Sequence, residues 1–331
     1  MNQLFRWDQT GLFLLALAAG ILPFAVPEVC AAALREGLTL CSGPLLLSLF
    51  PFLVVSRLLI QCPESDLLAL PFRLAAWGIG IRRPCAARVL CIGFLGGFAP
   101  AASAAAQAVR TGQLTAEEAD ALLPACICSG PSFVVLTVGQ SMLGSAELGV
   151  LLFAAQITAN YLTAALLNRF AGVHSVEQES AAPASPAPPR LDEILADAAI
   201  TYCKLCGFIL FFRLLAAGAG ALLPTGAGTL CAILLEVCSG CDLASRTGRW
   251  GSLLCCAALS VQGLSVLLQV RTICPAEMTL HPLYRARILH LPLSLALFYL
   301  LLPGGEADVF STLPARVLLM RRVPPDCALL V

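Results

Sequence analysis

Long apolar stretches follow one another through almost the whole chain, and each is close to the length of a membrane crossing. A helix needs about 20 mainly apolar residues to span the hydrocarbon core of a bilayer. Hydrophobic residues make up 59% of the sequence and charged residues only 12%, whereas soluble domains carry about 25% charged residues. The candidate segments are 11–27, 44–61, 87–109, 120–143, 146–168, 199–223, 226–243, 251–271 and 287–303.

These stretches predict an all-α, polytopic protein of a cell membrane, with roughly 8–10 membrane segments. Several segments are short or interrupted, so not all of them are expected to be full crossings. Segment 11–27 also resembles a signal peptide, but it exceeds the usual apolar core of about 7–15 residues, so we interpret it as a retained first helix. The amphipathic segment 28–43 is expected to lie along the membrane interface.

A stretch rich in Pro, Ala and Ser divides the chain into two membrane halves. Such a stretch is typical of a flexible or polyproline-like linker. Asp192 and Glu193 follow it and are expected in the first turn of a helix, where the helix dipole favours acids. We therefore assign an N-terminal half (1–170), a linker (171–190), a C-terminal half (191–303) and a polar tail (304–331).

Turn-forming residues interrupt two apolar stretches in each half. In the first half, a short helix, a polar turn and a helix capped by Thr115 are expected between two breaks. The second half repeats this order, with a polar turn at 246–248, which indicates a duplicated plan of interrupted helices, either re-entrant hairpins or kinked full spans. The expected break residues are Gly96, Gly97, Ser129, Gly130, Pro131 and Ser132 in the first half, and Ser239, Gly240, Gln262 and Gly263 in the second.

Broken helices are costly in a membrane, because unpaired N–H and C=O groups cannot bond to lipid. They persist where the backbone faces protein or a watery cavity, and each half-helix then presents a partly positive N-terminus that suits anions. Paired breaks of this kind hold substrates in membrane transporters. The alternative is that glycine and proline here serve only close helix packing or kinks.

Polar side chains inside the apolar segments are further candidates for the substrate site. Glu236 is an acid within an apolar helix, which favours proton coupling or capping of the broken backbone. Gln262, Ser265 and Gln269 form one stripe, and Gln156 and Asn160 form another four residues apart. Interhelical hydrogen bonding is the alternative role for both stripes.

Other functional classes find little support in the sequence. Net charge is zero, so nothing indicates binding to nucleic acid. Two Cys-x-x-Cys pairs, Cys203/Cys206 and Cys238/Cys241, have zinc-like spacing but lie in apolar segments, where cysteine packs as a small apolar residue. We predict no metal, no cofactor and no enzyme activity, because no cluster of acid–base or nucleophilic residues is seen.

Four motifs in order resemble the sporulation integral membrane protein family, the YlbJ or SpoVV-like proteins, within the nucleoside-recognition gate superfamily. They are "GFLGGFAPAASAAAQAVRTGQLTAEEADALLPACICSGPSF", "LLEVCSG", "QGLSVLLQV" and "RARILHLPLSLALFYLLL". The resemblance covers about residues 30–303. It departs from the family at Ile127 and Cys128, where the family usually has two asparagines, and at Ala101 and Ala102, where glycine is common.

The resemblance implies a transporter of dipicolinic acid in the outer forespore membrane of a spore-forming bacterium. Dipicolinate is a small planar dicarboxylate, which agrees with half-helix N-termini as its binding groups. A homo-oligomer or other sporulation membrane proteins are the expected partners. Two alternatives stay open: a scaffold for spore envelope assembly that transports nothing, and a transporter of nucleosides or other small solutes.

Overall fold

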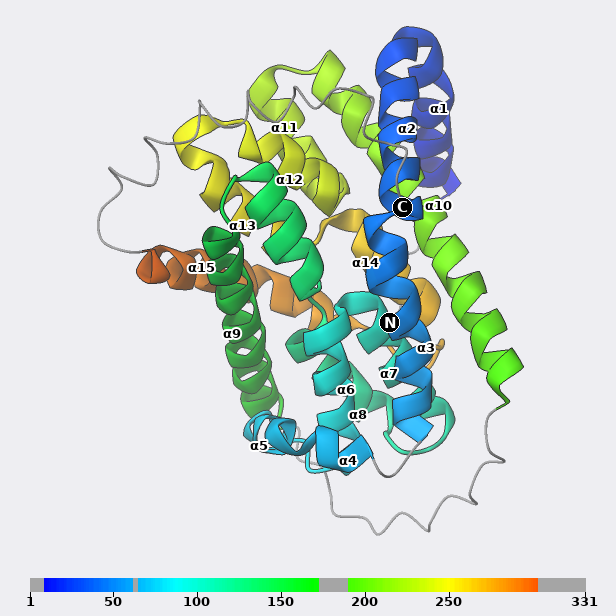
Figure 1. The fold of residues 1–331 in the computed structure, drawn as a ribbon, viewed down its shortest axis with the longest axis vertical. Helices are drawn as coiled ribbons and strands as arrows, with labels where there is room; N and C mark the ends of the chain where they lie inside the picture. Colours follow the sequence, from blue (N-terminus) through cyan, green and yellow to red (C-terminus); the bar gives the residue numbers. More distant parts are fainter. Residues whose placement is uncertain (1–8, 62–64, 173–189, 303–331) are drawn as a thin grey trace, which may run out of the picture.

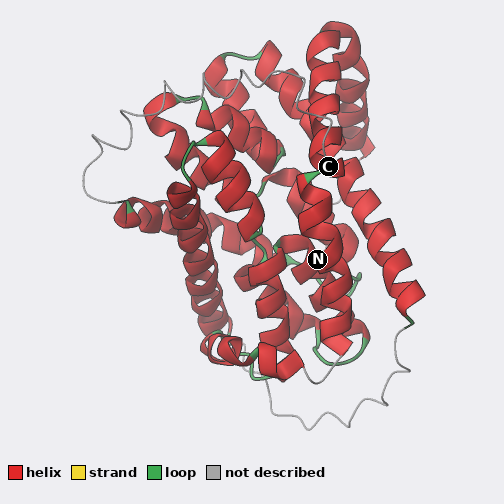
Figure 2. Cartoon of the chain, in the orientation of Figure 1, coloured by secondary structure: helices red, strands yellow, loops and turns green. Residues whose placement is uncertain are grey.

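The computed structural model describes residues 9–61, 65–172 and 190–302, and every regular element within them is helical (Figures 1 and 2). The predicted linker lies almost wholly outside these residues, and the predicted polar tail lies entirely outside them. The elements are α1 (Gln9–Ala25), α2 (Pro27–Ser42), α3 (Pro44–Gln61), α4 (Ser65–Leu68), α5 (Leu70–Gly78), α6 (Pro84–Gly96), α7 (Phe98–Arg110), α8 (Ala116–Cys126), η1 (Ser132–Met142), α9 (Ala146–Ala171), α10 (Leu191–Leu222), α11 (Thr225–Leu235), α12 (Val237–Ser245), η2 (Gly248–Trp250), α13 (Gly251–Val261), α14 (Gly263–Ile273) and α15 (His281–Leu301).

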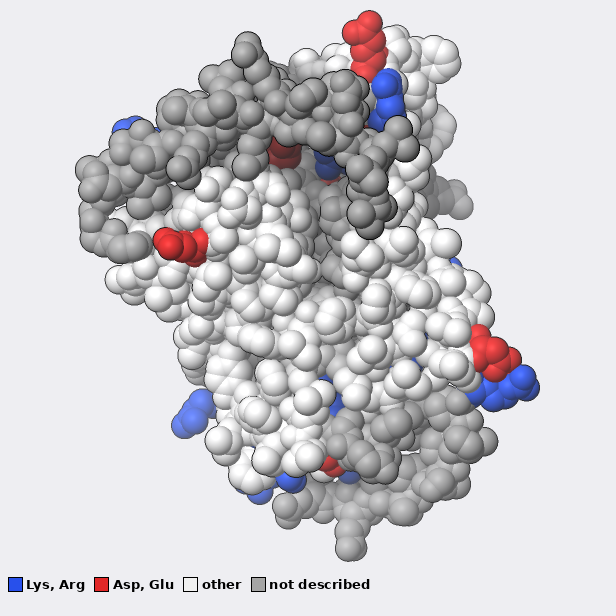
Figure 3. Space-filling model, in the orientation of Figure 1, with Lys and Arg blue, Asp and Glu red and all other residues white. Residues whose placement is uncertain are grey.

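Among the described residues, four helical runs are long and apolar enough to cross a membrane: Pro27–Ile60, Ala146–Ala171, Leu191–Leu222 and Gly248–Ile273. Large apolar side chains such as Phe24, Phe170 and Leu300 point outward and are at least 77% exposed. Most of the described surface in Figure 3 is uncharged, as a lipid-facing surface requires. The expectation of an all-helical chain with several apolar helices long enough for a membrane is confirmed, whereas the figure of roughly 8–10 segments stays a prediction.

The segment expected along the interface is arranged differently. Helix α2 continues into α3 with a bend at Gly43, so that Pro27–Ile60 forms one run of 34 residues. Glu36 of α2 pairs with Arg213 of α10 at 2.8 Å, and α2 lies beside α10 in Figure 1. The buried residues Cys30, Ala33, Gly37 and Cys41 follow the helical repeat, so the amphipathic pattern matches contact with another helix, while the position of α2 relative to a membrane interface stays a prediction.

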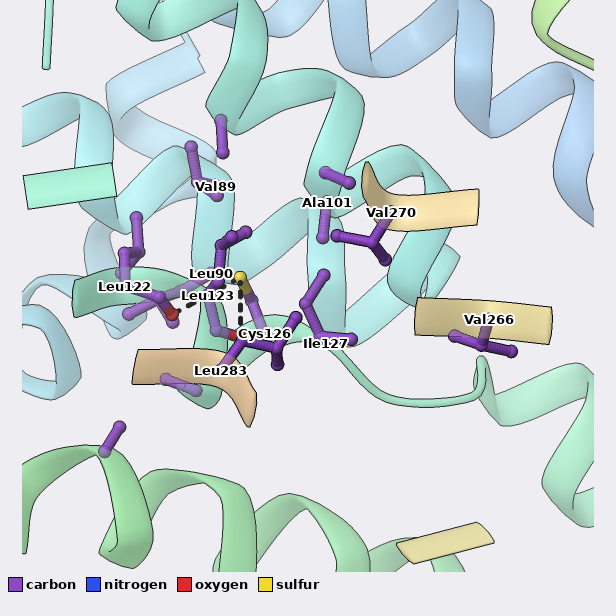
Figure 4. Packing of buried hydrophobic residues seen from close by; sticks show 14 of the residues in the cluster. Val89, Leu90, Ala101, Leu122, Leu123, Cys126, Ile127, Val266, Val270 and Leu283 are labelled. Atoms are coloured by element: carbon purple, nitrogen blue, oxygen red, sulfur yellow. Dashed lines mark hydrogen bonds between the residues drawn. The ribbon is translucent and has the colours of Figure 1, made fainter. Parts of the chain in front are cut away.

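Small residues allow the central helices to approach closely. Along α7, alanines such as Ala101, Ala102 and Ala105 are completely buried, because α7 is enclosed by α3, α6, α8 and α14. Figure 4 shows the adjoining core, where Leu90 of α6 meets Leu122 and Leu123 of α8. Close packing of small residues is the usual basis of helix association in membranes.

Two helix starts agree with the sequence. Thr115 and Glu118 form a reciprocal capping box at α8, with Glu118 N donating to Thr115 Oγ1 at 3.1 Å. Asp192 and Glu193 lie in the first turn of α10. These local signals are strong because cap and dipole interactions depend only on neighbouring residues.

Candidate functional site

Four helix breaks meet near the centre of the fold. In the first half, α6 and α7 are separated by Gly97, and α8 and η1 by an extended stretch that begins at Ile127. In the second half, α11 and α12 are separated by the extended Glu236, and α13 and α14 by Gln262, which has a left-handed backbone with φ of 66°. The element order helix, break, helix, turn, helix, break, helix therefore occurs twice.

Within each half, the two breaks touch through a glycine. A Cβ atom on Gly97 would lie 2.6 Å from the Gly130 nitrogen, and one on Gly263 would lie 3.0 Å from the Glu236 nitrogen. Gly97 also has φ of 81° and ψ of −164°, a conformation that is essentially confined to glycine. Backbone contact between breaks thus requires glycine at both crossings.

A central cavity of about 40 Å³ lies between the two pairs of breaks. This volume accommodates a few water molecules but not an aromatic dicarboxylate, so entry of a solute requires the surrounding helices to move apart. The lining residues are Leu45, Leu49, Gly96, Phe98, Ser129, Gly130, Ser132, Phe133, Ile209, Glu236, Val237, Cys238, Val266 and Gln269.

The first-half side of the central cavity presents hydrogen-bond donors at the start of η1. Ser129, Gly130, Ser132 and Phe133 line it, and the N–H groups of Ser132 and Phe133 precede the first backbone bond of this turn, which Val134 donates to Gly130. The helix η1 has wide, π-type turns over 11 residues. Such helices are rare and often mark functional sites.

The second-half side is occupied by the side chain of Glu236. This residue is 1% exposed and caps α12, because its carboxylate accepts from the Cys238 and Ser239 nitrogens at 2.8 and 2.7 Å and from Ser239 Oγ at 2.8 Å. The expected break at Ser239–Gly240 is therefore wrong by three residues, and both lie within the first turns of α12. Gly240 instead allows close packing, since a Cβ there would meet Ile233 Cα at 2.8 Å.

The polar stripe on α14 is partly directed at the central cavity. Gln269 lines it and donates to Ser265 Oγ at 2.8 Å, as their spacing predicted. Gln269 Oε1 is buried without a hydrogen-bond partner in the described residues. Gln262 instead donates to Leu259 O at 2.7 Å and terminates α13.

Gln156 and Asn160 belong to a buried polar network behind the first-half break. Asn160 donates to Ile127 O at 3.3 Å, and Arg287 of α15 donates to Asn160 Oδ1 at 3.0 Å. Gln156 Nε2 donates to Cys256 O at 3.2 Å. The network fixes the extended backbone at Ile127, so these two side chains support the site without lining it.

The network also contains residues that our sequence reasoning missed. Arg287 donates to Ile127 O and Ser260 O, both at 3.3 Å. His290 contacts Ser260 Oγ at 2.6 Å and Gln156 O at 3.2 Å through its two ring nitrogens. An ionisable residue in an apolar helix is itself a functional signal, and this signal was present in "RARILHLPL".

The predicted site residues therefore fall into three groups. Those that line the central cavity are Gly96, Ser129, Gly130, Ser132, Glu236 and Gln269. Those that shape its backbone or hold a lining side chain are Gly97, Pro131, Ser239, Gln262, Gly263 and Ser265. Those that lie elsewhere, in packing or in the buried network, are Gly240, Gln156 and Asn160.

Two larger cavities lie on either side of the central one along α10. The first, which we call the basic cavity, has about 180 Å³ and includes Arg57, Arg110, Lys204 and Asp197 among its lining residues. The second, the charge-paired cavity, has about 350 Å³ and is lined in part by two ion pairs, Glu36–Arg213 and Asp242–Arg246. The α10 residues that line the three cavities in turn include Thr201, Leu205, Ile209, Arg213, Ala217 and Ala221.

These α10 residues are spaced by four, so they form one continuous ridge along the helix. From Thr201 to Ala221 the ridge is about 30 Å long at the helical rise, which is the thickness of a bilayer core. An apolar cluster that includes Leu49, Leu53 and Leu205 lies between the basic cavity, which Leu205 lines, and the central one, which Leu49 lines. The capped start of α12 separates the central cavity, at Glu236, from the charge-paired cavity, at Ser239.

Comparison of the chain with family models, with curated proteins and with solved structures gives no match. The resemblance to the sporulation membrane proteins therefore stays a prediction.

Proposed function

We propose that the chain is a membrane transporter for a small carboxylate, with dipicolinate as the best candidate. The observation that carries this proposal is the row of three cavities along α10. They extend over about the thickness of a bilayer core, and the middle one is lined by residues of three of the four helix breaks and by α14. In an alternating-access carrier, the apolar cluster between the basic and central cavities and the start of α12 between the central and charge-paired cavities would act as the two closures.

The charges along this row favour an anionic solute. Arg57, Arg110 and Lys204 outnumber Asp197 in the basic cavity, so its field raises the local concentration of anions. Further along, the start of η1 offers backbone N–H groups and the hydroxyls of Ser129 and Ser132. Helix N-termini bind carboxylates through such donors.

A second candidate is a nucleoside or another neutral aromatic solute. Phe98 and Phe133 line the central cavity, and Gln269 Oε1 is an acceptor with no partner in the described residues. Aromatic rings can stack on a planar solute, and a free amide oxygen suits a donor group. Competition between dipicolinate and uridine distinguishes the two candidates.

Transport is tested with purified protein in proteoliposomes and radiolabelled dipicolinate. We expect saturable uptake that is absent in protein-free vesicles and that uridine does not compete. Gly130→Ala should reduce uptake strongly, because Gly130 lines the central cavity and the added methyl group makes only ordinary contact with the protein, 3.4 Å from Gly96 O. Gly207→Ala on α10 is the matched control, since nothing lies within 4 Å of its Cβ position.

Equal uptake by Gly130→Ala and Gly207→Ala would contradict the assignment of the central cavity as the solute site. Uptake of uridine but not of dipicolinate would replace the first candidate by the second. Absence of uptake of either solute by folded protein would overturn transport of both solute classes.

A further inference from the structure

The Glu236 carboxylate occupies a position that suits a solute carboxylate. It accepts both backbone N–H groups at the start of α12, from Cys238 and Ser239, at 2.8 and 2.7 Å. These donors are the ones that an anion would use at a helix N-terminus. The central cavity is lined by Glu236 and Cys238, so the occupied donors lie at its edge.

The Glu236 carboxylate also contacts a residue that lines the charge-paired cavity. Ser239 Oγ donates to Glu236 Oε2 at 2.8 Å, and Ser239 lines the charge-paired cavity. A proton can pass from water in that cavity to the Ser239 hydroxyl oxygen while the hydroxyl proton moves to Glu236 Oε2. Glu236 is thus connected to one cavity through a single hydroxyl and lines the next directly.

Charged and titratable groups surround this position on several elements. Arg213 of α10 interacts electrostatically with Glu236 and is also paired with Glu36 of α2. The thiols of Cys41 on α2 and of Cys238 and Cys241 on α12 are the other titratable neighbours. Arg213 therefore places a positive charge near the Glu236 carboxylate.

A second carboxylate, from the solute, would bring another negative charge to the start of α12. Two negative charges within a few ångströms in a poorly hydrated site repel strongly, so one of them takes up a proton. A protonated Glu236 no longer makes charge-assisted bonds to the α12 nitrogens. The solute carboxylate then accepts those bonds, and the net charge of the site is unchanged.

We propose that Glu236 is the proton-coupling site of the transporter, and that its protonation releases the start of α12 to one carboxylate of the solute. A dicarboxylate then places its other carboxylate toward the donors of η1 on the opposite side. This inference rests on the proposed function, and it adds the coupling ion and the residue that binds it. One proton enters with each solute and leaves when the solute does.

The test uses proteoliposomes with radiolabelled dipicolinate, with and without an inward proton gradient. We expect wild-type protein to accumulate dipicolinate only with the gradient, and a protonophore to abolish the accumulation. In Glu236→Gln the ratio of the two uptake rates should fall to one, and alkalinisation of the external medium during uptake should disappear. Glu147→Gln, an exposed residue in the first turn of α9, should behave as wild type.

Gradient-driven accumulation in Glu236→Gln would overturn the inference while leaving the proposed function intact. Wild-type uptake at the same rate with and without the proton gradient would also overturn the inference and leave the proposed function intact. Absence of any dipicolinate uptake by wild-type protein would overturn the proposed function first. If Glu236→Gln does not fold, Ser239→Ala decides, because loss of the relay hydroxyl should slow gradient-driven uptake and an unchanged rate would contradict the relay.

Discussion

The two halves of the molecule break their helices in the same order but satisfy the exposed backbone differently. In the first half, Gly97 and Gly130 touch directly, and small residues leave the start of η1 facing the central cavity. In the second half, the Glu236 side chain folds back and binds the start of α12. One helix N-terminus is therefore directed at the cavity, and the other already holds an anion that belongs to the protein.

A broken helix in a membrane can therefore satisfy its exposed backbone groups in two ways. Small residues permit backbone-to-backbone contact with a small hydrated space beside it, whereas a charged cap supplies the missing bonds within the chain. The first solution depends on the absence of side chains and the second on one carboxylate. Substitutions should therefore affect the two halves through different mechanisms.

The largest effect on stability is expected at the glycine crossing of the first half. Gly97→Ala requires a backbone conformation that costs about 1–3 kcal/mol for other residues, and its Cβ would also lie 2.6 Å from the Gly130 nitrogen. We expect a loss in the free energy of unfolding of at least about 3 kcal/mol for Gly97→Ala. Gly130→Ala should cost less than about 1 kcal/mol.

Unfolding of both variants in detergent micelles, followed by circular dichroism, measures this pair. Equal stability of Gly97→Ala and Gly130→Ala would show that the crossing does not constrain the backbone. Glycine would then serve only to leave space.

The next largest effect is expected at the cap of the second half. Glu236→Ala leaves two buried N–H groups without an acceptor, and each such group costs about 1–3 kcal/mol. We expect the free energy of unfolding to fall by about 3 kcal/mol in total. Ser132→Ala, at the start of η1 in the other half, should change it by less than about 1 kcal/mol.

Chemical unfolding of these two variants tests whether the halves differ as described. A small effect of Glu236→Ala would mean that water replaces the carboxylate easily. The second break would then resemble the first.

The smallest effect on stability is expected for Gln269→Leu. The substitution removes the hydrogen bond from Gln269 Nε2 to Ser265 Oγ, together with an Oε1 that has no partner in the described residues. We therefore expect the free energy of unfolding to fall by about 1 kcal/mol. We expect the Kd for dipicolinate to rise about fivefold, which corresponds to one hydrogen bond of about 1 kcal/mol. Binding is measured by equilibrium dialysis.

Gln156→Leu is the matched control, because its amide lies in the buried network and bonds to Cys256 O at 3.2 Å. We expect the opposite pattern, with a loss of about 2 kcal/mol in stability and no selective loss of affinity in the folded fraction. If Gln156→Leu and Gln269→Leu change stability and dipicolinate affinity to the same extent, the central cavity and the buried network do not have the separate roles assigned to them.

The sequence predicted the breaks best where glycine or a turn forms them. Gly97 and Gln262–Gly263 lie where expected, because left-handed or extended glycine backbone is a local property. The sequence predicted the break at Ser239–Gly240, whereas the structure has it at Glu236. Serine and glycine are common in turns, and glutamate is not, so the sequence pattern favoured the wrong position. The cap becomes evident only once the chain folds back at that residue.

Contacts between distant segments explain what the sequence did not predict. Arg287 meets Asn160 and Ile127, which are 127 and 160 residues away, and no local pattern predicts such a meeting. The sequence did not predict the ridge on α10 either. Its residues, such as Thr201, Leu205 and Arg213, differ in chemical type and have only their four-residue spacing in common. Periodicity gives the helix face, but the cavities also depend on side chains from α2, α3, α6, α7, η1, α12 and α14.

The most direct test of the account is amide hydrogen exchange of the purified protein, with and without dipicolinate. If the central cavity is the solute site, dipicolinate should slow exchange selectively in residues 129–134 and 236–239, where the two half-helix starts lie. Benzoate, with one carboxylate, should protect only one of these segments. Unchanged exchange in both segments at saturating dipicolinate, or protection confined to other helices, would contradict the account.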